Sequence, residues 1–167
     1  MMKVYYFCYN YASKIHQGFM MKRKSYDEMP CPVAQCLEHI GEWWSMLIIR
    51  DAFFGMKRFD EYQKSLGIAP NMLTRRLNDL TESGILEKQK YGESDKRYEY
   101  VLTQRGMDLA PILIMMLNWG NQHYPPKGVK VNLVNIHTNE IAEPIVIDKK
   151  TGEEITLGSY QVKVSED

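Results

Sequence analysis

The residues best suited to chemistry lie within one expected helix, residues 71–83, and their chemistry is recognition rather than bond making. Setting 100° per residue places three leucines on one face: Leu73, Leu77 and Leu80. The opposite face carries four polar side chains: Asn71, Thr74, Arg75 and Asn78. Arg76 lies at the edge between the two faces. If the leucines pack inward, the polar face is free to enter a DNA major groove, which just admits a helix.

Each polar side chain has a defined use against a duplex. An arginine such as Arg75 can make a bidentate contact to guanine, and an asparagine can make one to adenine. Thr74 can reach a phosphate or a thymine methyl group. A polar helix face with one arginine is more often simply solvated, so the interpretation depends on what surrounds it. The full set of candidate DNA contacts is Asn71, Thr74, Arg75, Arg76 and Asn78, with Lys57, Arg58, Lys96 and Arg97 as candidates for phosphate groups.

Hydrophobic periodicity predicts the elements that position this helix. An apolar stripe indicates a helix over residues 32–52, and a short helix follows over 59–66. Residues 67–70 form a tight turn. Residues 85–91 have the pattern of a strand, and the alternation of Tyr98, Tyr100 and Leu102 indicates a second strand after a polar hairpin tip. This order of elements predicts an α+β fold, a winged helix-turn-helix.

The segment after the second strand predicts a subunit interface. Thr103 can cap the next helix, and Pro111 should kink that helix or divide it in two. From Ile112 to Trp119 only Asn118 is polar, so the segment must bury more than one face. A chain this short has few ways to do so alone, and we expect a homodimer. The candidate interface residues are Ile112, Leu113, Met116 and Trp119.

Composition limits the classes of function. The chain has 167 residues, 44% of them hydrophobic, and its 21 basic and 21 acidic residues give zero net charge, which excludes a uniformly basic nucleic-acid binder. Residues 55–105 nevertheless hold ten basic and eight acidic residues. No stretch approaches the length of a membrane span, and no signal-peptide pattern is present. We therefore expect a cytoplasmic protein without a membrane partner.

Taken together, the motifs resemble those of the HxlR-type (DUF24) transcriptional regulators over about residues 29–124. The motifs that carry the resemblance are Cys31-Pro32-Val33, residues 40–44 (IGEWW), residues 58–61 (RFDE), residues 67–77 (GIAPNMLTRRL), Leu80, Gly84, Tyr98-Glu99-Tyr100, Leu102-Thr103 and Gly106. The resemblance implies a homodimeric winged-helix regulator that binds inverted-repeat promoter DNA.

This chain departs from the family pattern at three places. Glu42-Trp43 stands where the family usually has Gly-Lys. Ala69 stands where a serine commonly caps the recognition helix, so we expect that cap to be lost. The hairpin lacks the usual pair of prolines.

Cys31 aligns with a cysteine that some members of this family use to sense electrophiles or oxidants. A thiol just ahead of a helix N-terminus meets the positive end of the helix dipole, which favours the thiolate. The alternative is a cysteine that merely packs. Cys36 lies on the apolar stripe and is expected in the core, and together with His39 it makes only a weak metal pair because no further ligand is evident.

We expect three segments: an N-terminal extension or arm over residues 1–28, the DNA-binding and dimerisation domain over 29–124, and a β-rich tail over 125–167. Residues 1–20 have the pattern either of an extension from an early start codon or of a genuine arm. In the tail we expect short strands near residues 129–133, 145–147 and 155–157, a turn at 148–153 and no role in DNA contact, because residues 128–167 hold four basic and seven acidic residues. No internal repeat is evident.

Two classes of function compete. The first is a sequence-specific, dimeric DNA-binding regulator whose effector is a small molecule or an oxidant. The second is a winged-helix protein-interaction module without DNA binding, which the zero net charge favours somewhat. An enzyme has little support, because the sequence shows no Ser-His-Asp cluster, phosphate-cradling glycine loop or recognisable pair of carboxylates, and its four histidines are scattered. No cofactor is expected.

Overall fold

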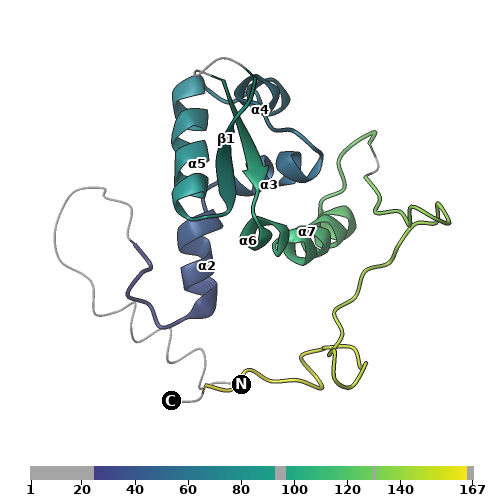
Figure 1. The fold of residues 1–167 in the computed structure, drawn as a ribbon. Coiled ribbons are helices and arrows are strands. Elements are labelled where there is room, and N and C mark those ends of the chain that lie inside the picture. The colour runs from purple at the N-terminus through teal and green to yellow at the C-terminus, as the bar shows by residue number, and fades with distance from the viewer. Residues whose placement is uncertain (1–24, 93–96, 130, 165–167) are drawn as a thin grey trace. The chain divides into compact units, whose positions relative to one another are not determined.

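The computed structural model describes residues 25–92, 97–129 and 131–164 (Figure 1). These residues fall into two compact units, one of residues 39–144 and one that combines the segment ending at Glu38 with the segment beginning at Ile145. The expected domain boundaries at residues 28 and 124 remain predictions. Within the described ranges, no helix is both long and apolar enough to cross a bilayer.

The first expected helix is two helices, α2 (Pro32–Ile40) and α3 (Ser45–Phe53), so the prediction of one helix over 32–52 is wrong. The break begins at Gly41, a poor helix former. A turn replaces the continuous helix, because the backbone N–H of Ser45 donates to the carbonyl of Glu42 at 2.9 Å. Helix α3 begins after this turn and buries Ile48 and Ile49 completely.

The helix-turn-helix follows the predicted pattern closely. Helix α4 (Phe59–Leu66) ends at Gly67, whose φ of +62° suits glycine, and α5 (Pro70–Glu82) begins after an extended Ala69. Ala69 supplies no side-chain cap, as expected from the sequence. Pro70 takes the first turn of α5, where its missing N–H costs nothing.

The core of the residue 39–144 unit forms where α3, α4 and α5 pack on a two-stranded sheet (Figure 1). The three leucines Leu73, Leu77 and Leu80 are all 0% exposed, which confirms the inward face of α5. Tyr62 of α4 is also fully buried, and its hydroxyl donates to the carbonyl of Met56 at 2.8 Å. Burial raises the pKa of Tyr62 above its ordinary value, so this phenol stays neutral and holds its bond.

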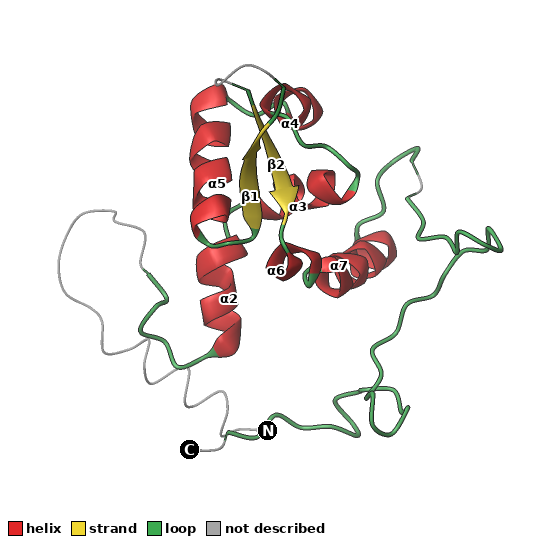
Figure 2. Ribbon diagram, viewed as in Figure 1, coloured by secondary structure: helices red, strands yellow, loops and turns green. Residues whose placement is uncertain are grey.

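The wing is an antiparallel hairpin, as predicted (Figure 2). Strand β1 (Leu86–Lys90) pairs with β2 (Tyr98–Leu102), with Leu86 opposite Leu102 and Lys90 opposite Tyr98. The tip, residues 93–96, lies outside the described residues. Together with the helices, this sheet confirms the α+β winged helix-turn-helix.

Two helices close the domain, α6 (Gln104–Met107) and α7 (Ala110–His123). Thr103 caps α6, because its hydroxyl accepts the N–H of Gly106 at 3.2 Å. Pro111 lies in the first turn of α7, so the expected division at this proline is confirmed.

The tail is less regular than expected. In place of three strands, its described residues form isolated bridges between Val134 and Ile141 and between Ile147 and Glu154, with turns between the partners. The two turns have the same hydrogen bonds: Asn139 N to Asn135 O matches Gly152 N to Asp148 O, and Ala142 N to Leu133 O matches Ile155 N to Val146 O. A short motif is therefore repeated, and the expectation of no internal repeat missed it.

Candidate nucleic-acid interface

The outward face of α5 is the feature most suited to reading a duplex. Its polar residues are all exposed: Asn71, Thr74, Arg75 and Asn78. Within the described part of the chain, no side chain pairs with the guanidinium of Arg75, so its five donors remain available. The hydroxyl of Thr74 donates to the carbonyl of Pro70 at 2.9 Å, and the residue is exposed.

Arg76 does not belong to this exposed face, which corrects its place among the candidate DNA contacts. It is only 4% exposed, and its guanidinium lies between two carboxylates. Its Nη1 is 2.9 Å from Asp79 Oδ2, and its Nη2 is 3.5 Å from Glu42 Oε2. Helical spacing predicts Arg76 at the edge of the polar face. In the structure its guanidinium lies inward, because it pairs with Glu42 from another segment.

Lys57 and Arg58 lie immediately before α4, and both are exposed. Glu61 accepts the backbone N–H groups of both residues at 2.9 Å, which fixes the start of the helix. Arg58 Nη2 also pairs with Glu61 Oε1 at 3.0 Å, and this carboxylate raises the pKa of Arg58. Lys57 is therefore the less neutralised of the two phosphate candidates.

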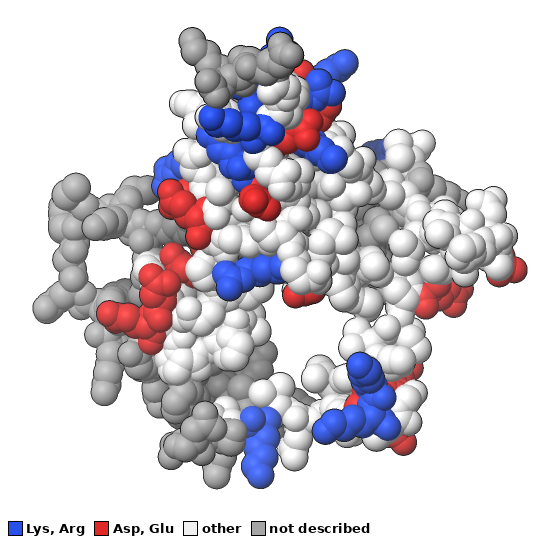
Figure 3. All heavy atoms as spheres, viewed as in Figure 1, with Lys and Arg blue, Asp and Glu red and all other residues white. Residues whose placement is uncertain are grey.

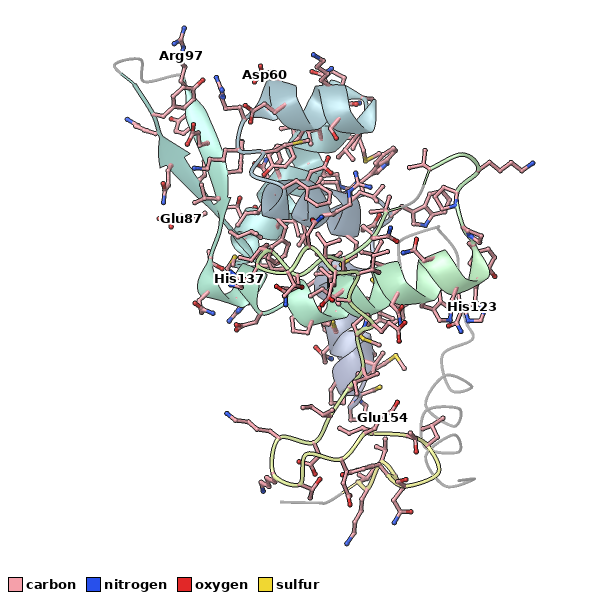
Figure 4. The ribbon with its side chains drawn as sticks, turned by 90° about the vertical axis from the view of Figure 1, so that its right-hand side faces the viewer. Asp60, Glu87, Arg97, His123, His137 and Glu154 are labelled. Carbon is pink, nitrogen blue, oxygen red and sulfur yellow. The ribbon has the colours of Figure 1, made fainter. Side chains whose placement is uncertain are left out.

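The wing contributes further positive charge. Arg97 is exposed beside the tip, and Figure 4 shows it pointing away from the helices at the same end of the unit as Asp60 of α4. Lys96, the other expected tip residue, lies outside the described residues. On β1, Lys88 Nζ is 4.2 Å from the ring centroid of Tyr98 and 5.8 Å from that of Tyr100. These aromatic contacts restrain an exposed ammonium group that the sequence analysis did not select.

Basic side chains gather at one end of the domain even though the chain is neutral. Figure 3 shows Lys and Arg side chains around the hairpin and the neighbouring ends of α4 and α5, with a few acidic groups among them. This local excess agrees with the ten basic and eight acidic residues of segment 55–105. A basic end that also presents a polar helix face is suited to bind a polyanion whose base edges can form hydrogen bonds with that face.

Comparison with known proteins gives the family. The profile described as HxlR-like helix-turn-helix matches residues 37–128, more than half of the chain. The chain belongs to the HxlR-like helix-turn-helix family. The resemblance noted in the sequence is therefore confirmed, and the protein is a transcriptional regulator of the helix-turn-helix type.

Individual relatives and solved structures support the same family assignment for this HxlR-like regulator. The uncharacterised HTH-type transcriptional regulator Rv3095 of Mycobacterium tuberculosis is 38% identical over 125 residues, 74% of this chain and 79% of its own. The crystal structure of PA1607, named as a transcription factor, is 37% identical, with a TM-score of 0.76, and covers 85% of this chain and 100% of its own. The reduced form of the redox regulator HypR is 33% identical, with a TM-score of 0.52, and covers 56% of this chain and 95% of its own.

Helix α7 of the HxlR-like chain has an unusual amount of apolar exposure. No residue of α7 is buried, and Ile112, Met116 and Trp119 are among its exposed side chains, while Leu113 is half-buried. The Trp119 ring lies 5.3 Å from the ring of Tyr124 and 5.1 Å from that of His123. An isolated subunit would leave this apolar face in water.

Cys31 of the HxlR-like chain is partly exposed and immediately precedes α2. The backbone leading to it is fixed by Gln35, whose side-chain amide donates to the carbonyls of Tyr26 at 2.9 Å and Met29 at 3.0 Å. Cys36 is also partly exposed rather than in the core. Among the residues described, no group of three or more His, Cys, Asp or Glu side chains is arranged to hold a metal ion.

Proposed function

We propose that this regulator binds double-stranded DNA sequence-specifically, and that a homodimer does so at inverted-repeat promoter sites in the cytoplasm. One observation carries the proposal: α5 buries its leucines completely and leaves Asn71, Thr74, Arg75 and Asn78 exposed. A helix whose polar face is open, at the basic end of the domain, has the form of a major-groove reader.

Each exposed residue has a proposed role. Arg75 contacts guanine through its bidentate donors, and Asn71 or Asn78 contacts adenine. Thr74 meets a thymine methyl group, or it meets a phosphate when its hydroxyl turns from the Pro70 carbonyl to the DNA. Phosphate contacts come from the flanking segments through Lys57, Arg58, Lys96 and Arg97. Arg76 is left out, because it is buried.

Dimerisation through α7 supplies the two-fold symmetry that an inverted repeat needs. The exposed apolar face with Ile112, Met116 and Trp119, together with the half-buried Leu113, supports this assignment. A symmetric pair would present two copies of α5 to half-sites one helical turn, or a multiple of it, apart.

Selection of bound duplexes from a random-sequence library tests the proposal. The expected product is an inverted repeat whose half-sites are spaced by whole helical turns. Recovery of unrelated sequences would remove the claim of specific reading. If the protein captured no DNA at all, the alternative of a winged-helix protein-interaction module would stand in its place.

We further propose that Cys31 adjusts DNA affinity in response to electrophiles or oxidants. The partly exposed thiol at the start of α2 supports this role, as does the likeness to HypR, which is named as a redox regulator. Diamide should weaken DNA binding by the wild type and leave a Cys31→Ser variant unaffected. A Cys31→Ser variant that responds like the wild type would overturn the sensing role, and a Cys36→Ser variant is the matched control.

A further inference from the structure

The buried guanidinium of Arg76 ties the proposed reading helix to a distant part of the chain. Arg76 lies on α5 between Arg75 and the leucine face, and its side chain is 5% exposed. Its Nη1–Asp79 Oδ2 pair, at 2.9 Å, lies within α5 itself. Its Nη2–Glu42 Oε2 pair, at 3.5 Å, joins α5 to the turn between α2 and α3. Only the second pair can fix α5 relative to another element.

The chemistry of this site points to orientation rather than to simple packing. A buried charge is costly unless it is paired, and α5 already has three buried leucines to hold it against the core. Apolar contacts are non-directional, whereas a guanidinium–carboxylate pair has a preferred geometry. Arg76 Nε is buried and has no acceptor among the described residues, so its hydrogen bonding depends on its two Nη atoms.

Glu42 is itself held in place. Its carbonyl accepts the backbone N–H of Ser45 at 2.9 Å, and Ser45 is a buried residue of the first turn of α3. The carboxylate of Glu42 therefore projects from a structured turn and not from a loose loop. A carboxylate carried by this ordered backbone and paired with a buried guanidinium restrains the rotation of α5 about its own axis.

We propose that the Glu42–Arg76 pair positions α5 for base reading, so that both are positioning residues that act through Arg75 and Asn78. The proposal rests on the proposed DNA-binding function. Rotation of α5 about its axis displaces the tip of the long Arg75 side chain more than it displaces the shorter leucine side chains of the buried face. Loss of the pair should therefore reduce discrimination between sequences while phosphate contacts, which tolerate small shifts, persist.

Two matched variants test this proposal. Glu42→Gln removes the carboxylate that joins α5 to the α2–α3 turn, and Asp79→Asn removes a carboxylate from the same guanidinium but within α5. The probes are a duplex selected by the wild type from a random library and a shuffled duplex of the same composition. The measured quantity is the ratio of the two affinities at one salt concentration, with thermal melting to confirm folding.

For Glu42→Gln we expect the ratio of the two affinities to fall by about five- to a hundredfold, which is the range for one lost bidentate base contact. The affinity for the shuffled duplex should not change. Asp79→Asn should keep the wild-type ratio within about twofold, since the tie between elements remains. In an Arg76→Met background, Glu42→Gln should have no further effect, because the pair is already absent.

Three outcomes would overturn the positioning role. They are an unchanged ratio in Glu42→Gln, an equal loss of affinity for both duplexes, and equal falls in the ratio for Glu42→Gln and Asp79→Asn. Should Glu42→Gln fail to fold, the ratio measured for Arg76→Met decides, and a wild-type value there contradicts the proposal. A wild type that does not distinguish the duplexes is a different failure, because it removes the proposed function itself.

Discussion

Two adjacent arginines on α5 have opposite environments. The Arg75 guanidinium faces outward, and the Arg76 guanidinium is buried between Glu42 and Asp79. Helical spacing alone could place Arg75 outward and Leu77 inward. Whether a residue at the edge between the two faces is buried depends on which side chain of another element lies opposite it. Glu42 lies far from Arg76 in sequence, so no local pattern revealed the pair.

At Arg75, replacement by alanine should cost about 1–3 kcal/mol of specific binding and relax the preference at one operator position, because a bidentate base contact is lost. The measurement is fluorescence anisotropy with the selected duplex and with its single-base variants. Arg97→Ala is the comparison, since a phosphate contact should weaken binding to every sequence alike and reduce the salt slope by about 1. Equal losses from both variants on every duplex would remove Arg75 as a base reader.

Gly106 is required for a close approach. A Cβ at this position would clash with the backbone carbonyl oxygen of Ile85, an atom that cannot move aside cheaply. Gly106→Ala should therefore destabilise the fold by about 1–3 kcal/mol. Urea unfolding measures the change. Gly120→Ala is the control, because its Cβ would meet nothing within 4 Å, and a Gly106 variant as stable as that control would contradict this account.

Among the secondary-structure elements, the sequence best predicted the helices and strands that are bounded by clear turn residues. Helix α4 begins at Phe59 and ends before Gly67, and Tyr98, Tyr100 and Leu102 alternate along the second hairpin strand, so periodicity and turn residues agree there. The helix over 32–52 was wrong because the apolar stripe continues across Gly41, and only tertiary packing decides whether the helix breaks there. The wing lysine Lys88 was missed because only the folded hairpin brings it over Tyr98.

The start of α4 should respond to acid. Two backbone N–H groups, from Lys57 and Arg58, hold the pKa of Glu61 below its ordinary value of 4.5. A lowered folded-state pKa means that the ionised carboxylate contributes stability above about pH 4.5, and that this contribution is lost as the pH falls below that value.

The test compares the wild type with Glu61→Gln. The difference between their free energies of unfolding should be largest near neutral pH and should shrink below about pH 4.5. Urea unfolding at several pH values measures it, with Asp60→Asn on the same turn as the control. A difference that stays constant from neutral to acid pH would show that the Glu61 charge does not support this helix start.

In the molecule as a whole, the described residues leave many apolar side chains exposed. No residue of α7 is buried, and the tail has many exposed aliphatic side chains, among them Ile136, Ile141 and Leu157. The sequence predicted a subunit interface from the apolar run at 112–119. The repeated turns of the tail escaped prediction, because their similarity lies in hydrogen bonds more than in residue identities.

The α7 face predicts how the oligomer can be broken. Met116 is 51% exposed on this face, and Met116→Glu should place a charge in the interface and shift the protein to monomers. Sedimentation velocity measures the shift. Gln122→Glu, a change of equal charge at an exposed polar position of the same helix, should leave the dimer intact. A Met116→Glu protein that remains dimeric would place the interface elsewhere.

We propose that this neutral protein binds a duplex through a locally basic end and reads it with α5. The decisive measurement is the salt dependence of the wild-type affinity for the selected duplex. If both subunits contribute their flanking cations, affinity should fall by about a thousandfold or more between about 50 and about 200 mM salt, linearly on logarithmic axes. An affinity that does not change with salt would contradict the claim.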